Sequence, residues 1–255
     1  NNIHTSGAFR RKDPVQIQFL YTLEDPDKRY LIYFPSVAWT RTNGFMAGVA
    51  LHNGTLIPKP FEYLLVPFYA FGTKQLTGYG KISFNKILYD NFIRLASLTL
   101  EGMQFGAPGT QEFKRRRIGL DFYLRSGSST NNFNQKVFGL YTSASDLMQI
   151  ENLTPAEMRS YLQFGYLLDK TRTINPFSMA VSFESGKSYQ KTSIELNYKY
   201  SYEGKKSGLD FRMFAGTMLR NDAPDPFYAL SASGRSGREL YLYEGVYPDR
   251  FSEFP

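Results

Sequence analysis

Cysteine is absent from this 255-residue chain, and histidine occurs only at His4 and His52. Without cysteine there is no disulfide, no thiolate zinc site and no cysteine nucleophile. A catalytic zinc takes about three protein ligands at close spacing, and the chain has neither HExxH nor HxH. We therefore expect no catalytic, cofactor-binding or metal-binding residues and no cofactor in this chain.

Long apolar runs are also missing. A transmembrane helix needs about 20 consecutive apolar residues, and the nearest approaches are the short runs Leu31–Phe34 and Leu64–Phe71. The sequence also lacks GxSxG, GxGxxG and a Walker-type phosphate loop. If the chain crosses a membrane, it must do so with strands closed into a barrel.

Aromatic residues, glycine and proline are abundant: 22 Phe, 19 Tyr, 21 Gly and 13 Pro. This balance favours strands and tight turns over helices. The clearest pattern has a period of two, which is typical of a strand with one apolar and one polar face. It runs through Ile194–Tyr200 and, after a short turn, through Leu209–Met213, so the two segments predict a hairpin.

Similar segments follow one another along the chain, separated by clusters of Gly, Pro, Asn and Asp. Their regular spacing predicts one all-β domain over residues 1–255, an antiparallel sheet of about 12 or more strands. The remaining expected strands are Val15–Leu23, Arg29–Trp39, Phe45–Leu51, Phe61–Phe71, Tyr79–Asn85, Phe92–Leu100, Ile118–Leu124, Lys136–Ser143, Tyr161–Leu168, Phe177–Glu184 and Leu240–Tyr243.

Two architectures fit such a sheet, a soluble β-sandwich and a transmembrane β-barrel. Tyr and Phe recur at strand ends, as aromatic girdles at the two membrane interfaces require. The other face carries charges that a polar lumen accommodates and a sandwich core does not, namely Asp121, Arg125, Glu195, Lys199, Asp210 and Arg212. We therefore expect an antiparallel transmembrane β-barrel, with the sandwich as the alternative.

Several segments depart from a simple meander. Pro35 and Pro67 fall inside strand-like runs, where we expect bulges or strand boundaries. Thr154-Pro155-Ala156-Glu157 has the form of a capping box and predicts a short helix. The chain starts at Asn1 without Met, and Arg238–Pro255 does not read as a closing strand, so we expect the barrel to be incomplete in this sequence.

The net charge is +7 and the pI is about 9.3, but the basic residues are dispersed. The one tight run, Lys114–Arg117, is typical of a solvated face or a strand end. The aromatics follow strand faces and do not cluster near the arginines, so we expect no nucleic-acid partner. The expected partners are outer-membrane lipid, including lipopolysaccharide phosphates, and other outer-membrane or periplasmic proteins.

Two sets of residues are candidates for catalysis, a single histidine and a pair of carboxylates. His52, at the end of the Phe45–Leu51 strand, is the residue that could activate a serine in a barrel lipid hydrolase, but a loop histidine facing water explains it more simply. Glu195 and Asp210 could approach each other across their hairpin, although charges in a barrel lumen are usually structural pairs.

Two segments carry a resemblance to a known family. The first, Leu31–Asn85, contains Asn43-Gly44-Phe45-Met46, Gly48, Leu51-His52-Asn53, Lys59-Pro60-Phe61-Glu62 and Phe71-Gly72. On these residues it looks like the start of the β-barrel that follows the peptidase region in large Bacteroidota proteins similar to gluzincin (M1-like) zinc aminopeptidases. The second, Arg238–Arg250, is similar to a barrel hairpin of that group and, more distantly, of surface-antigen (Omp85-like) barrels.

The resemblance implies a barrel in the outer membrane of a Gram-negative bacterium that anchors a peptidase-like domain, and it transfers no catalytic residue to this chain. We therefore expect a membrane anchor or a subunit of an outer-membrane assembly. A transport or translocation barrel and, behind it, a hydrolase using His52 are the alternatives.

Overall fold

The computed structural model describes residues 15–20, 29–54, 59–89, 91–107, 111–126, 133–145, 158–170, 174–202 and 207–222. They form a single twelve-stranded sheet. The strands are β1 (Val15–Phe19), β2 (Arg29–Thr40), β3 (Gly44–His52), β4 (Phe61–Ala70), β5 (Gln75–Ile87), β6 (Ile93–Ala107), β7 (Gln111–Leu124), β8 (Phe133–Ser145), β9 (Met158–Lys170), β10 (Phe177–Gly186), β11 (Tyr189–Ser201) and β12 (Gly208–Asn221).

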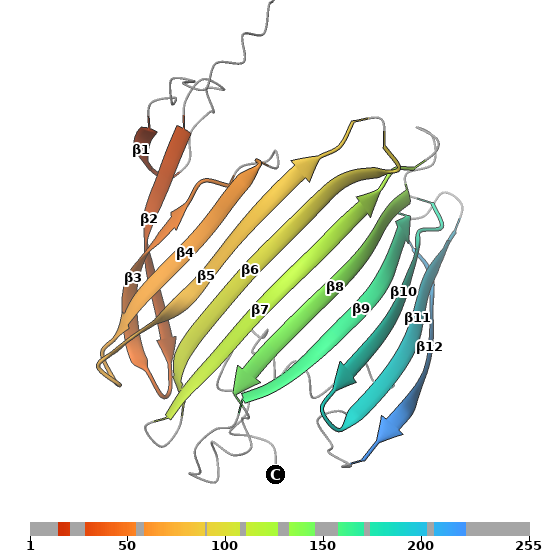
Figure 1. The fold of residues 1–255 in the computed structure, drawn as a ribbon. Coiled ribbons are helices and arrows are strands. Elements are labelled where there is room, and N and C mark those ends of the chain that lie inside the picture. The colour runs from red at the N-terminus through yellow and green to blue at the C-terminus, as the bar shows by residue number, and fades with distance from the viewer. Residues whose placement is uncertain are drawn as a thin grey trace, which may run out of the picture.

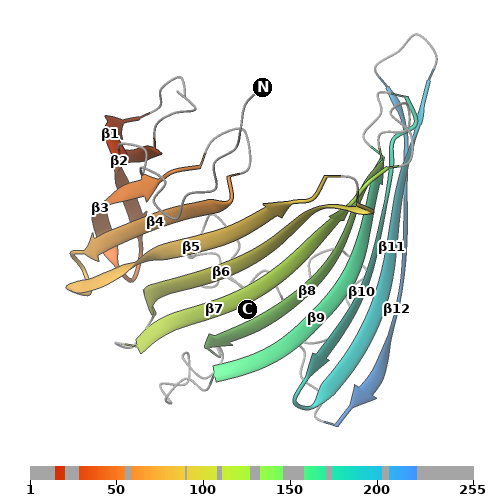
Figure 2. The same ribbon diagram turned by 45° about the horizontal axis from the view of Figure 1, so that its top comes forward.

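Each strand lies beside its neighbour in sequence, and β2 to β12 form a continuous meander (Figure 1). All neighbouring pairs from β2 to β12 are antiparallel, and β1 and β2 are parallel. The strands are long and tilted, and the sheet curls into an open trough whose ends are β1 and β12 (Figures 1 and 2). The described sheet is not closed, because β1 and β12 are not paired with each other.

The all-β prediction is confirmed, and each expected strand between Val15 and Met213 overlaps an observed one. The expected strand Leu240–Tyr243 and the expected helix at Thr154–Glu157 lie outside the described residues, as does His4. The parallel pairing of β1 departs from the expected meander. Several strands are also longer than expected, and β7 begins at Gln111, so that Lys114–Arg117 lies inside a strand.

The two prolines lie inside continuous strands. At Pro67 the β3–β4 pairing is interrupted between Gly48↔Phe68 and Leu51↔Leu65, but the register is the same on both sides of the gap and β4 continues through Pro67, so the expected bulge or strand boundary is not found. The expectation for Pro35 is also wrong, since it pairs with Val49 in a ladder without a register shift. β1 ends opposite Tyr33, so β2 is an edge strand from there on, where a proline is tolerated.

The strands have an inner and an outer face that differ in exposure. The inner face is the more buried one and includes Met46, Ala50, Phe113 and Thr142, all exposed by 1% or less. The outer face carries large apolar side chains that remain accessible, with Val37 70% exposed. Because successive side chains of a strand point to opposite sides, this division follows the interior strands of the sheet. The edge strands β1 and β12 are largely exposed on both faces.

The turn between β2 and β3 is held by a fully buried amide. Asn43 Nδ2 donates to Thr40 Oγ1 at 2.9 Å and to the Gly106 carbonyl at 3.2 Å, and Gly106 N–H donates to Asn43 Oδ1 at 2.9 Å. Gly72 N–H donates to the Asn43 carbonyl at 2.8 Å. A Cβ on Gly106 would lie 2.5 Å from Asn43 Oδ1, so these hydrogen bonds require glycine at position 106. They connect the β2–β3 turn to β6 and to the β4–β5 turn.

Candidate functional surfaces

The most extensive feature of the described residues is the apolar outer face. Its central positions are aliphatic on most strands: Ile82, Leu98, Leu100, Ile118, Leu120, Val137, Val181, Ile194, Leu196 and Met213. On β9 they are Phe164 and Tyr166. The cross-strand register places these residues on one side of the sheet. A contiguous exposed apolar surface of this kind marks contact with lipid or with another protein.

Aromatic side chains border this region at one end of the strands over β2 to β4 and at the other end over most of the sheet. Near one end, Trp39, Phe45, Tyr69 and Phe71 gather, with Phe45 and Phe71 stacked at a centroid distance of 5.8 Å. Near the other end, Phe61 meets Phe84 at 5.3 Å. At that same end, a cross-strand row continues over β8 to β12 through Phe133, Lys170, Phe177, Tyr198 and Phe211.

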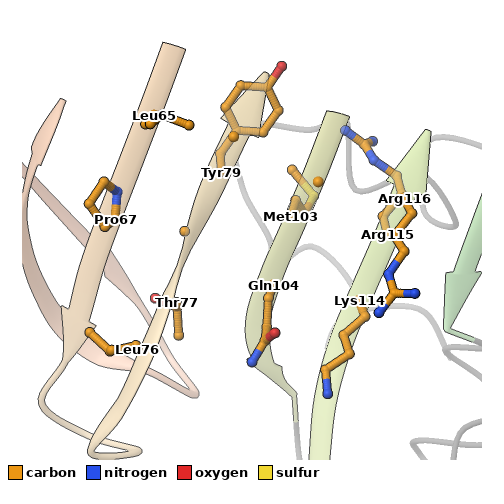
Figure 3. Close-up of a pocket in the computed structure, with 13 residues that line it drawn as sticks. Leu65, Pro67, Leu76, Thr77, Tyr79, Met103, Gln104, Lys114, Arg115 and Arg116 are labelled. Atoms are coloured by element: carbon orange, nitrogen blue, oxygen red, sulfur yellow. The ribbon is translucent and has the colours of Figure 1, made fainter. Parts of the chain in front are cut away.

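A groove interrupts the outer face over β4 to β7, close to the strand ends that carry Trp39 and Phe71. It leaves about 570 Å³ of free space. Figure 3 shows Leu65, Pro67 and Leu76 on one side of it and Gln104, Lys114 and Arg116 on the other. Two cross-strand rows form it, Leu65–Gly80–Gly102–Arg116 and Pro67–Gly78–Gln104–Lys114.

Charged groups on the inner face pair with one another. Glu101 accepts a hydrogen bond from Tyr79 Oη at 3.0 Å and faces two guanidinium groups, with Arg115 Nη2 and Arg117 Nη1 each 3.6 Å from a carboxylate oxygen. Arg115 is 4% exposed. The run Lys114–Arg117 is therefore divided between the two faces, which the sequence analysis did not foresee.

A second inner cluster lies on β10 and β11. Glu184 accepts a hydrogen bond from Tyr189 Oη at 2.6 Å and pairs with Lys191 Nζ at 3.3 Å, and all three side chains are buried. Between the two clusters, Arg117, Thr142, Tyr161 and Gly186 follow one cross-strand row. The inner face therefore carries a polar layer from β5 to β11 in which Glu101 and Glu184 are each paired with basic groups.

His52 lies in a separate depression of the inner face. This depression has about 410 Å³ of free space and is lined by Phe34, His52, Gly54, Glu62, Tyr63, Leu64, Lys81 and Ser83. The His52 ring contacts Phe34 edge to face, and its Nδ1 lies 3.2 Å from the Gly54 carbonyl oxygen. The Ser83 hydroxyl, which also lines this depression, is hydrogen-bonded to Thr99 Oγ1 at 3.2 Å and not to His52. Within the described ranges no hydroxyl group is hydrogen-bonded to His52, so the geometry gives no serine–histidine pair.

The two carboxylates considered in the β11–β12 hairpin are not brought together. Glu195 Oε1 accepts a hydrogen bond from Arg212 Nε at 2.7 Å, whereas Asp210 lies opposite Lys199. The register therefore gives each acidic residue a basic neighbour. Elsewhere in the described part of the chain, no three His, Asp or Glu side chains are grouped so as to hold a metal ion.

No helix among the described residues is long and apolar enough to span a membrane. In comparisons with protein-family models, with curated proteins and with solved structures, the chain has no match. The resemblance of Leu31–Asn85 to a peptidase-associated barrel therefore stays an expectation from the sequence. The fold and the surfaces described above are the basis on which a function can be proposed.

Proposed function

We propose that this chain is a transmembrane β-barrel domain of a bacterial outer membrane, serving as an anchor or as a subunit of an outer-membrane assembly. The observation that carries the proposal is the outer face, which is mainly aliphatic in the centre, aromatic along the end that carries Phe61 and Phe211, and aromatic at the other end over β2 to β4. Lipid hydrocarbon with its two interfaces is the environment that matches this order.

The dimensions support the same environment. On β4 the outer-face aromatics Phe61 and Tyr69 are separated by about 26 Å along the strand, at about 3.3 Å per residue. At a strand tilt of about 40° this separation covers about 20 Å of height, so both aromatics would lie just inside the ends of the apolar band, which is about 25 Å tall in outer-membrane barrels. In water, by contrast, an apolar face of this extent would aggregate.

Inside a bilayer the sheet must be closed, because an unpaired strand edge in hydrocarbon leaves its N–H and C=O groups without partners. In the proposed barrel the free edges of β1 and β12 are therefore hydrogen-bonded, either to each other or through additional strands. The inner charges, paired as Glu101–Arg115 and Glu184–Lys191, then line or fill the lumen.

The lengths of the connections favour one orientation. Connections 41–43, 71–74, 108–110 and 187–188 are short and lie at one end of the sheet, which also carries the longer connection 146–157; we call it the short-turn end. Connections 53–60, 88–92, 125–132, 171–176 and 202–207 lie at the other end. Outer-membrane barrels have short periplasmic turns and longer extracellular loops, so we assign the short-turn end to the periplasm.

The choice of an anchor or assembly subunit rests on the resemblance of Leu31–Asn85 to the barrel that follows a peptidase-like region. A pore would need an open lumen, which single-channel conductance in planar bilayers would detect. The expected result for an anchor is no discrete conductance steps.

Membrane insertion is tested by expressing the chain behind a secretion signal and fractionating the cells. The proposal predicts recovery with the outer membrane, resistance to extraction with carbonate, and a mobility on unheated gels that changes after boiling. Recovery as a monodisperse protein in detergent-free buffer would refute it.

A further inference from the structure

The outer-face groove over β4 to β7 (Figure 3) is the strongest candidate for a specific binding site. Its walls differ in chemistry. The wall on the β4 side is formed by Leu65 and Pro67, and Leu76 lies at the short-turn end of β5. The opposite wall is basic, and the next cross-strand row toward the middle of the strands, Ile82–Leu100–Ile118, is entirely apolar.

The three glycines in the groove differ in whether the backbone requires glycine at their positions. Gly78 has a φ of +146°, and a Cβ there would collide with the Val66 carbonyl, so the backbone itself requires glycine. A Cβ on Gly102 would meet nothing within 4 Å, and one on Gly80 would meet only Leu65 Cδ2 at 3.4 Å. The fold therefore tolerates side chains at Gly80 and Gly102, although glycine weakens a strand interior. Glycine inside a strand often marks a bulge, a bend, or the close approach of a ligand or another backbone, and neither Gly80 nor Gly102 lies at a register shift.

The basic wall of the groove carries two cationic side chains that an anion could reach. Arg116 is exposed on the outer face, and no carboxylate of the described residues forms an ion pair with it. Lys114 Nζ pairs with Glu112 at 2.6 Å but is 43% exposed, and an ammonium group has three protons to donate. Arginine binds phosphate oxygens through two parallel N–H groups, and a lysine beside it adds a point charge.

We propose that the groove binds one anionic glycerophospholipid, with its phosphate on Arg116 and Lys114 and an acyl chain over Gly80 and Gly102. The inference rests on the proposed function, because it requires the outer face to contact the bilayer. The groove lies toward the short-turn end, which we assign to the periplasm. The periplasmic leaflet of an outer membrane consists of glycerophospholipids, so the occupant is a phospholipid and not lipopolysaccharide.

The test is native mass spectrometry of the full 255-residue chain in detergent micelles, with equal amounts of phosphatidylglycerol and phosphatidylcholine added. The wild type is expected to retain one phosphatidylglycerol in preference to phosphatidylcholine. Arg116→Gln removes a charged hydrogen bond to phosphate, and Gly102→Leu fills the groove. Each substitution is expected to lower retention of phosphatidylglycerol by about tenfold or more.

Two matched variants act as controls. Lys86→Gln removes an exposed outer-face charge near the opposite end of the strands. Gly139→Leu adds the same side chain to an outer-face glycine outside the groove, where a Cβ meets only Phe164 ring atoms at 3.4 Å. Both controls are expected to retain lipid like the wild type. If Lys86→Gln reduced retention as much as Arg116→Gln, the groove would have no special role and the proposal would be wrong.

Failure of the site and failure of the proposed function can be distinguished. Insertion of each variant into phospholipid vesicles is measured first, by protection from added protease. A chain that inserts but shows no preference for phosphatidylglycerol would overturn the lipid site alone. A chain that does not insert would overturn both. Unchanged lipid retention together with loss of a co-purifying protein in Gly102→Leu would assign the groove to a protein partner and likewise overturn the lipid site.

Discussion

Replacing Ile194 by Arg tests the depth dependence that a lipid-facing strand must show. Ile194 lies near the middle of β11, is 37% exposed on the outer face, and has Val181 and Ala215 as cross-strand neighbours. No polar group of these neighbours can receive a guanidinium group there. Arg on the lipid face at mid-bilayer costs about 2–4 kcal/mol, which is about 30- to 1000-fold in the unfolding equilibrium.

Tyr200→Arg is the matched comparison, because Tyr200 lies on the same face of β11, one residue before the strand ends at Ser201. Near the interface the cost falls to about 0–1 kcal/mol. The assay is reversible urea unfolding of each variant in phospholipid vesicles, followed by tryptophan fluorescence. Equal costs for Ile194→Arg and Tyr200→Arg, or no cost for Ile194→Arg, would refute the assignment of this face to lipid.

Four further substitutions test the inner face and the turn between β2 and β3. Asn43→Ala leaves the N–H and C=O of Gly106 without their amide partner and is expected to destabilise the barrel by about 1–3 kcal/mol in the same unfolding assay. Glu101→Gln removes the carboxylate shared by two inner arginines and is expected to lower the free energy of unfolding by about 3 kcal/mol. Glu195→Gln, at an exposed ion pair, is the control and should scarcely change the urea midpoint. His52→Ala is expected to leave hydrolysis of a short-chain ester at the level of the unmodified chain, and a loss of activity would revive the hydrolase alternative.

The faces of the strands were predictable wherever apolar and polar residues alternate strictly. Ile194–Tyr200 and Leu209–Met213 form the expected hairpin. It could be predicted because apolar and polar residues alternate in both segments. The strand β7 was predicted too short, since its first half carries polar residues on both faces. Lys114 and Arg116 point outward, while Arg115 and Arg117 lie beside Glu101 on the inner face. Because basic residues lie on both faces, the sequence of this segment shows no alternation of apolar and polar residues.

Contacts between distant residues could not be predicted from local patterns. Asn43 is bonded to Gly106 across 63 positions of sequence, and no periodicity links them. The partner of Glu195 depends on the register of β11 and β12, which gives it Arg212 and not Asp210. The groove was missed for a similar reason, because Gly80 and Gly102 become neighbours only when β5 and β6 are aligned.

Trp39 offers the most direct measurement of the central claim, that the outer face contacts lipid. It is the single tryptophan of the chain, lies 66% exposed on that face, and belongs to the aromatic margin at the short-turn end. In vesicles containing brominated phospholipids, we predict blue-shifted emission and stronger quenching by bromines near the headgroup than by bromines near the end of the acyl chain. Emission typical of an indole in water, with no quenching by either lipid, would contradict the account.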